Sequence, residues 1–537
     1  MKKMSLFLFG AAWLAAAAVR AAAPDLIAQI HFAGAAQISA DTNAAAFTRL
    51  WCTPEAQALR SQTLDKLARA PHTWFKAELL PNAGDGSAQL RPLLGDLLSA
   101  EWFLQIRDAA NGSPEYALAI RLDAARAQAW QSGLKSLLEA WTGVAAEKRA
   151  DGWSLKKHDP PNRFQFIRAG DWIVCGAGQN ELTLNGELIR RISAEKRPVP
   201  VDKNEWVTAD LDWRRLARWF PSINPFDLPQ TRLRVVGRDR QLRLDGDMIF
   251  PQPLGLTLDK WRMPLDTIHQ PVASFTAVRG IAPWLQHQNW AQPYEISPVP
   301  NQVYIWSMAQ MPLQTFVAIP VPNAQKALRE FGQKMSARPE WQSHFSEPIT
   351  MVVSNTQIAW RGVPFVAPIL RAVHESSGDF LIGEFFPNSP KSKQPLPPEL
   401  FQELSRSNLV LYHWEATPVR LNFLPHLTQL ALMATHHRQF NVQSVAGKWL
   451  ASIEPTLGTS VTAVTQTGPN ELAVLRKAPA GLTAIELVAL GNWLEATNFP
   501  GCDLRLPPRP FFRRPPQKAP PMSPASTPGK PKPPAKP

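Results

Sequence analysis

The stretches 253–257 (PLGLT) and 479–483 (PAGLT) are almost the same, and their positions decide how the fold is read. Each follows a segment with the alternating pattern of a β-hairpin, at 233–250 and at 460–477. The second hairpin has a clear turn at Gly468, Pro469 and Asn470. The repeated motif therefore predicts that two similar series of elements end at these two points.

Two series of predicted elements lead up to the motifs, with apolar periodicity separating strands from helices. The first contains strands or hairpins at 26–34, 102–107, 116–123, 163–178, 206–212 and 233–250, with helices at 43–70, 124–141 and 180–192. The second contains strands or hairpins at 271–279, 303–308, 315–322, 349–362, 408–416 and 460–477. Its helices are one from Gly280, those at 323–335 and 397–405, and one that follows the strand at 408–416. The shared order predicts an internal duplication. The alternative is that strand–helix alternation is common enough to look periodic by chance.

Hairpins interleaved with helices favour an α+β fold with mixed or antiparallel sheets over parallel βαβ winding. We predict two similar lobes and a disordered Pro-rich C-terminal tail. The predicted organisation is a signal peptide at 1–21, an N-terminal lobe at 22–250, a connection at 251–270, a C-terminal lobe at 271–503 and a basic tail at 504–537.

The first residues have the layout of a secretory signal peptide. Lys2 and Lys3 precede an uncharged apolar run at 6–19, and small residues up to Ala21 provide a cleavage site. The run is shorter than the roughly 18–20 residues that span a bilayer, so a retained anchor is the lesser alternative. We expect export to the periplasm or the cell exterior, with no transmembrane span.

The last residues, from Pro507 onward, contain thirteen prolines, seven Lys or Arg and no acidic residue. Such a composition favours extended, solvated polyproline segments. Without the tail and the signal, the formal charge of +13 falls to about +3, so the basic pI does not indicate a nucleic-acid partner. The tail is predicted to touch an anionic envelope polymer or an aromatic groove, or to be a solvated extension only.

No cofactor is predicted. Gly176 and Gly178 follow an apolar strand, as in a dinucleotide-binding turn, but Glu181 occupies the third glycine position. Neither a P-loop nor a CxxC pair is present. The three cysteines are too scattered for a disulfide framework, although export leaves one bridge open: Cys52, Cys175 and Cys502.

The densest histidines lie between His413 and His437. His413 and Glu415 share one face of a predicted strand, and His426 lies on or after the following helix, which makes these three the weak catalytic candidates. No metal site is predicted, because the HExxH pattern is absent and the adjacent His436 and His437 would point about 100° apart on a helix.

Tryptophan is unusually frequent, with twenty Trp against four Tyr. The default interpretation places each indole in the core with its N–H bonded to a carbonyl oxygen. Exposed indoles would instead suit sugars or hydrophobic partners.

The stretches at 260–285 and at 40–71 resemble a group of uncharacterised, secreted bacterial proteins of several hundred residues. This resemblance implies export and an α+β body. It implies no substrate, cofactor or catalytic residue.

The sequence therefore predicts a non-enzymatic exported binding or scaffolding protein of the cell envelope, with a binding surface between the lobes near 251–270. The alternative is an envelope hydrolase acting on glycan or peptide through His413, Glu415 and His426. A third hypothesis is self-assembly through exposed tryptophans.

Overall fold

The computed structural model describes residues 26–75, 79–108, 113–158, 161–179, 181–200, 202, 204–219, 228–268, 271–286, 296–309, 314–337, 349–363, 366–386, 399–423 and 443–501. The predicted signal peptide and tail lie outside these residues, as do His426 and Cys502. Among the described helices, none combines the length and the apolar character needed to cross a bilayer.

The strands of the first half are β1 (Leu26–Phe32), β2 (Trp102–Asp108), β3 (Pro114–Arg121), β4 (Glu147–Arg149), β5 (Gly152–His158), β6 (Pro161–Ala169), β7 (Trp172–Gly178), β8 (Glu205–Asp212), β9 (Gln230–Arg238) and β10 (Gln241–Ile249). Those of the second half are β11 (Val272–Arg279), β12 (Gln302–Met308), β13 (Thr315–Val321), β14 (Thr350–Val353), β15 (Gln357–Arg361), β16 (Ile369–Glu375), β17 (Gly378–Glu384), β18 (Leu409–Ala416), β19 (Thr459–Gly468) and β20 (Glu471–Ala478).

The helices that matter below are α2 (Ala35–Ala40), α3 (Ala45–Trp51), α4 (Pro54–Phe75), α5 (Ser87–Ser99), α6 (Ala124–Thr142), α7 (Thr183–Glu195), α10 (Ala324–Ser336), α11 (Glu399–Gln402), the 3₁₀ turn η6 (Glu403–Ser405), α13 (Val445–Ile453) and α14 (Ala484–Glu495). Several start at a capping side chain. Asp123 accepts the Arg126 amide, and Thr483 forms a capping box with Glu486.

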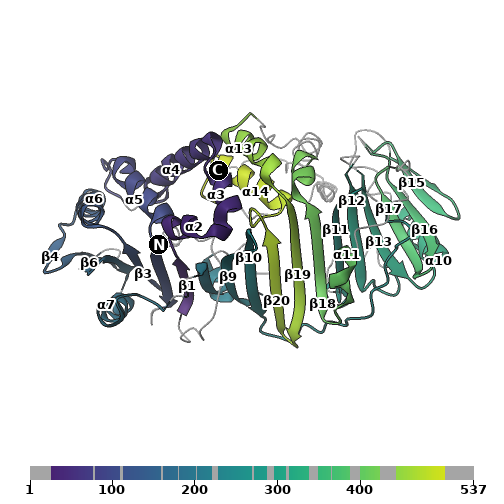
Figure 1. Ribbon diagram of the computed structural model, residues 1–537, viewed down its shortest axis with the longest axis horizontal. Coiled ribbons are helices and arrows are strands. Elements are labelled where there is room, and N and C mark those ends of the chain that lie inside the picture. The colour runs from purple at the N-terminus through teal and green to yellow at the C-terminus, as the bar shows by residue number, and fades with distance from the viewer. Residues whose placement is uncertain are drawn as a thin grey trace, which may run out of the picture.

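The described strands form one sheet of twenty, and every pairing is antiparallel (Figure 1). The spatial order is β4-β5-β6-β7-β3-β2-β1-β8-β9-β10-β20-β19-β18-β11-β12-β13-β17-β16-β15-β14. The α+β prediction is confirmed in its broad form, and parallel winding is wrong.

The pairing pattern of β1–β10 is repeated by β11–β20. Counted inward from its own edge of the sheet, each strand of the first half occupies the same place as the strand numbered ten higher in the second half. The irregularities repeat as well. Bulges at Leu26/Ala28 and Glu205/Val207 in the first half recur at Val272/Ser274 and Leu409/Leu411 in the second. The halves meet where β10 pairs with β20, and Asp245 lies opposite Leu475 near the centre of that pairing.

The repeated motif itself is not placed equivalently. PLGLT starts four residues after Ile249, the end of β10, and continues as an extended chain. PAGLT follows Ala478 directly and leads into α14. Both central glycines turn with positive φ, 61° at Gly255 and 73° at Gly481. The motif therefore encodes a similar turn at two different points of the repeated pattern.

The hairpin prediction is right at β6–β7, β9–β10, β14–β15 and β19–β20 but incomplete. Each half contains a four-stranded meander instead of a single hairpin, β4–β7 and β14–β17. The hairpin predicted at 163–178 is β6–β7, and its equivalent in the second half is β16–β17. The hairpin predicted at 349–362 is β14–β15, which is instead equivalent to β4–β5. The sequence interpretation missed β4–β5 and β16–β17.

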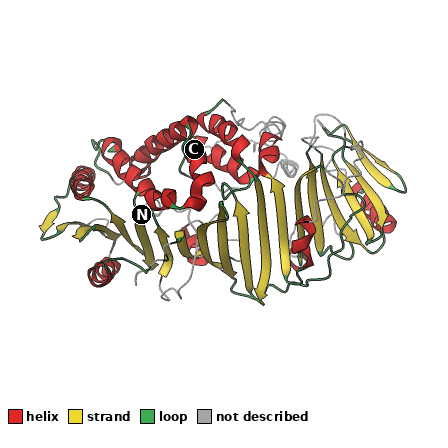
Figure 2. Cartoon of the chain, viewed as in Figure 1, coloured by secondary structure: helices red, strands yellow, loops and turns green. Residues whose placement is uncertain are grey.

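The sheet has two faces, which we name by the side chains that they carry. Face A carries Ile30 and Thr276, and face B carries Gln29 and Phe275. Helices α2–α6, α10, α13 and α14 contribute to the cores on face A, whereas α7 and α11 with η6 cover parts of face B. Figure 2 shows α11 in front of its strands, with the centre of face B beside it free of any described helix.

Helices from the two ends of the chain pack together on face A. The Trp51 ring stacks on Trp449 with centroids 5.3 Å apart, and the Trp449 Nε1 donates to the Leu50 carbonyl at 3.4 Å. Lys66 Nζ donates to the Leu494 carbonyl at 2.6 Å. This layer joins α3 and α4 to α13 and α14, so it ties the two halves together beyond the shared sheet.

The predicted cleft near 251–270 is not observed in the described part of that segment. The chain from Leu256 to Ile268 packs on the second half, where Ile268 is buried in its core. The buried Arg279 stacks on Trp261 and donates to the carbonyls of Asp259 and Arg406 at 2.7 and 3.0 Å. Burial of this guanidinium lowers its pKa. The described part of the connection is thus an extended segment that packs against the second half.

Candidate functional site

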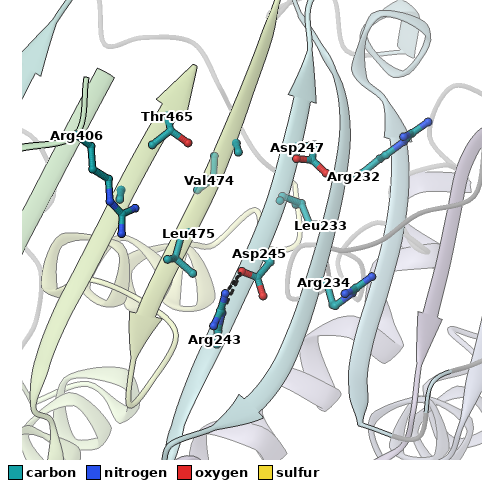
Figure 3. Close-up of a pocket in the computed structure, with 13 residues that line it drawn as sticks. Arg232, Leu233, Arg234, Arg243, Asp245, Asp247, Arg406, Thr465, Val474 and Leu475 are labelled. Carbon is teal, nitrogen blue, oxygen red and sulfur yellow. Dashed lines mark hydrogen bonds and ion pairs between the residues drawn. The ribbon is translucent and has the colours of Figure 1, made fainter. Parts of the chain in front are cut away.

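A groove lies on face B where the two halves meet (Figure 3). Its volume is about 340 Å³, and its walls come from β9 and β10 of the first half and from β19, β20 and the Arg406 loop of the second. The lining residues are Arg232, Leu233, Arg234, Arg243, Asp245, Gly246, Asp247, Arg406, Ala463, Thr465, Ala473, Val474 and Leu475.

Strand pairing explains how distant segments assemble the groove. Side chains on one face of a sheet alternate along each strand and line up across strands. One transverse row is Thr465, Ala473, Asp247 and Arg232, and the next row is Ala463, Leu475, Asp245 and Arg234. The groove therefore runs across the strands, with small aliphatic side chains toward β19 and charged ones toward β9.

The arginines of the groove are partly exposed and each has an acidic neighbour. Arg243 donates to Asp245 at 3.0 Å, and Arg234 Nε lies 2.8 Å from Glu205. Arg406 lies on the opposite side of the groove from Arg234 (Figure 3) and pairs with Glu403 at 3.0 Å. A guanidinium has five N–H donors, so these contacts leave donors for a ligand.

The fourth arginine, Arg232, has a weak partner. Its Nε lies 3.9 Å from Asp210 Oδ1, and that buried oxygen has no hydrogen-bond partner among the described residues. Burial raises the pKa of Asp210 to about 6, although Arg232 lowers it in part. Burial likewise raises the pKa of Glu205. Next to the first-half wall of the groove, β8 thus carries two carboxylates, Glu205 and Asp210, whose pKa values are raised by burial, beside arginines that are always charged.

A second polar group, which we name the polar cluster, lies on face A of the second half. It consists of Ser274, Thr276, Ser307, His413, Glu415, Thr417, Arg420, Ser460 and Thr462. In it, His413 Nδ1 is 2.8 Å from Thr276 Oγ1, and His413 Nε2 is 3.5 Å from Glu415 Oε2. Hydroxyl, imidazole and carboxylate therefore form one chain.

Glu415 is 1% exposed and is held by several donors. The Ala484 amide at the start of α14 donates to it at 2.7 Å, and Thr417 Oγ1 donates at 3.0 Å. Burial alone would raise the pKa of Glu415, but the bonds from His413, Ala484 and Thr417 outweigh it and lower the pKa. Burial lowers the pKa of Arg420, which donates to Ser307 at 3.2 Å. The carboxylate is thus ionised and fixes α14 to the sheet.

The structure places two of the three predicted site residues together. His413 and Glu415 lie on one face of β18, as the strand pattern predicts, while His426 is outside the described residues. Thr276 was missed because it lies 137 residues earlier in the chain and meets His413 only through the β11–β18 pairing. The groove was also missed, although charged residues alternating with apolar ones along β9 and β10 signalled a charged sheet face.

Other sequence expectations can be placed in the structure. Gly176 and Gly178 end β7, and a Cβ at Gly176 would lie 2.9 Å from Asn185 of α7, so the glycines permit close helix packing. Several indoles, including Trp153 and Trp172, donate to main-chain carbonyls. Cys52 and Cys175 are free thiols, and burial raises the pKa of Cys175 to about 12.

Within the described ranges, no three His, Cys, Asp or Glu side chains gather in a way that suits a metal ion. Comparison with known proteins returns no match: no family model, no curated protein and no solved structure is similar enough to indicate a relationship.

Proposed function

We propose that this chain is an exported, non-enzymatic binding protein of the cell envelope, and that its binding surface is the groove on face B. The observation that carries the proposal is the position of the groove. It is lined by both halves, on a sheet face whose centre carries partly exposed charges. Export and the envelope location rest on the N-terminal sequence pattern and on the resemblance to secreted bacterial proteins.

We further propose that the two halves are duplicated lobes. The repeated pairing order and the matching bulges support this origin, because a bulge is a specific local feature of a strand. In this proposal, the β10–β20 pairing joins the lobes into one sheet, and the basic tail supplies a second, weaker contact with an anionic envelope polymer.

Binding is favoured over catalysis by the chemistry of the groove. Among its described lining residues, Thr465 is the single hydroxyl, and His, Cys, Lys and Glu are absent. Its carboxylates, Asp245 and Asp247, lie beside Arg243 and opposite Arg234 and Arg232, and the described lining offers them no imidazole or thiol partner for proton transfer or nucleophilic attack.

The second candidate is the predicted hydrolase, favoured by the chain of Thr276, His413 and Glu415. A hydroxyl, an imidazole and a carboxylate in sequence are the components of nucleophilic catalysis. However, the Glu415 oxygens already accept the Ala484 amide and the Thr417 hydroxyl. These bonds suit a role in fixing α14 better than a role in turnover.

The test uses the full-length mature chain and isolated bacterial envelope material, with cosedimentation and release of soluble sugar ends or amines measured together. Ala473→Trp and Thr465→Trp fill the groove, and His413→Ala is the matched change in the polar cluster. A variant with the seven tail cations replaced by Gln separates binding by the tail.

We expect cosedimentation without product, lost in the groove variants and kept in His413→Ala. Product release that His413→Ala abolishes would establish the hydrolase instead. Absence of cosedimentation with every envelope fraction would refute the binding function.

A further inference from the structure

We propose that the groove binds an extended acidic peptide segment of a partner protein, with two carboxylates about four residues apart. This inference rests on the proposed function, since it names the ligand of the same groove. It follows from the charge, the composition and the direction of the groove.

The charge of the lining is the first argument. The residues that line the groove include four arginines and two aspartates, so the lining itself carries a net positive charge. The other acidic neighbours of these arginines, Glu205, Asp210 and Glu403, lie outside the lining. The side chains of Arg406 and Arg234 are 48% and 43% exposed, so they reach solvent beside the groove. Arginine binds a carboxylate through two parallel N–H bonds, and charge-assisted bonds of this type are about twice as strong as neutral ones.

The uncharged part of the lining is the second argument. Ala463, Ala473 and Leu475 supply the aliphatic surface, and none of the described lining residues is aromatic. Nucleobases are held chiefly by stacking on aromatic side chains, and sugar rings often add such stacking to their hydrogen bonds. Small aliphatic side chains of a peptide fit this surface better than either.

The direction of the groove sets the length of the ligand. Arg406 lies on the β19 side, and Arg232 and Arg234 lie on the β9 side, with β20 and β10 between them (Figure 3). Four neighbouring strands spaced ~4.8 Å apart span about 14 Å, which is the rise of roughly four extended residues at ~3.3 Å each. Residues i and i+4 of an extended peptide point the same way, so acidic residues at that spacing meet the two ends of the groove.

The anchoring of Arg406 supports its role at one end. The buried Arg279 donates to the main-chain carbonyls of Arg406 and Ser407 at 3.0 and 2.6 Å. The backbone of the Arg406 loop is therefore held in place while the guanidinium remains half exposed. Preorganisation of this kind reduces the entropy lost when a ligand binds.

The experiment measures fluorescence anisotropy of labelled peptides with the full-length mature chain. The probe is AAEAVAEAA, and the controls are AAQAVAQAA, which lacks the charges, and AAAEVEAAA, which changes the spacing. The protein variants are Arg234→Gln, Arg406→Gln and the groove-filling Ala473→Trp. Arg60→Gln, an exposed arginine on α4, is the matched control, and circular dichroism verifies the fold of each variant.

We expect AAEAVAEAA to bind about 10-fold more tightly than AAQAVAQAA, because each charge-assisted bond contributes more than a neutral one. Arg234→Gln and Arg406→Gln should each weaken binding roughly 5–10-fold, and Arg60→Gln by less than about 2-fold. Raising NaCl from 50 to 300 mM should weaken binding, because exposed charges are screened.

Three results would overturn the inference. If no acidic peptide binds at millimolar concentration while Ala473→Trp abolishes binding to envelope material, the peptide class is wrong and the proposed function stands. If an oligogalacturonate binds more tightly than the peptide and is sensitive to Arg406→Gln, the ligand is an acidic glycan. If the peptide binds Ala473→Trp unchanged, the groove is not its site and the inference fails, while the proposed function is still decided by cosedimentation of the same variant with envelope material.

Discussion

The inner strands of the two halves have the same pairing, but their polar and apolar side chains lie on opposite faces of the sheet. On face A, the first half carries Ala28, Ile30, Ile106, Ala209 and Leu211, all buried beneath helices. The positions that match them by pairing and by bulges in the second half are Ser274, Thr276, Ser307, His413 and Glu415. One half thus has an apolar core where the other has the polar cluster.

Face B shows the reverse exchange. Gln29, His31, Gln105, Thr208 and Asp210 of the first half correspond to Phe275, Ala277, Trp306, Tyr412 and Trp414 of the second. Each half therefore places its main apolar core on a different side of a shared sheet. Because buried polar groups are costly unless they are bonded, each polar side is a place to look for function. The groove borders the polar side of the first half.

The largest expected loss of stability comes from the apolar core on face B of the second half. Trp306 is fully buried and stacks on Phe316 with centroids 4.9 Å apart. Trp306→Ala should lower the free energy of unfolding by about 3–5 kcal/mol, measured by urea denaturation. The matching change Gln105→Ala should cost only about 1 kcal/mol, because it removes one neutral hydrogen bond, to Gln29. Equal losses would contradict the assignment of separate cores.

The next effect concerns the buried carboxylate of the polar cluster. Glu415→Ala leaves His413 and the Ala484 amide without their acceptor, and should destabilise the fold by about 3 kcal/mol at pH 7. The pKa of Glu415 is lowered in the fold, so its contribution is present above its ordinary pKa and is lost as the pH falls through the folded value. The difference between wild type and Glu415→Gln in urea should shrink below pH 4. If the difference in unfolding free energy between wild type and Glu415→Gln stays constant with pH, the ionised Glu415 carboxylate is not the source of the stability.

The sequence predicted local features correctly, but it did not reveal that polar and apolar side chains change faces between the two halves. It recognised hairpins from their turns and placed His413 and Glu415 on one strand face, because both signals lie within a few residues. It missed β16–β17 and relied on PLGLT, which is offset by four residues from the structural repeat. Matching positions such as Ile30 and Thr276 differ in polarity, so the repeated pairing leaves little trace in the residue pattern. The groove joins segments more than 200 residues apart, such as β10 and β20, and that is visible only in the fold.

The polar side of the first half should show the opposite pH response. The pKa of Asp210 is raised from 3.8 to about 6, so its ionisation costs stability as the pH rises through that range. The charged group that opposes this effect is Arg232 on β9, whose Nε lies 3.9 Å from Asp210 Oδ1. Asp210→Asn should therefore stabilise the protein by roughly 1–3 kcal/mol at pH 8 and by almost nothing at pH 4. Stabilisation at both values would assign the gain to packing instead of charge.

The smallest effect tests whether face A of the second half is open. Leu104 is 2% exposed beneath the helices of the first half, whereas Ile305, at the matching position, is 39% exposed. Leu104→Ala should cost about 2–4 kcal/mol in urea denaturation, and Ile305→Ala less than about 1 kcal/mol, because the cost of truncation follows the burial that is lost. If Ile305→Ala costs as much as Leu104→Ala, this face is covered in solution. The cover that α10 gives to β15–β17 on this face would then extend to β12, which would leave the groove as the more accessible of the two polar surfaces.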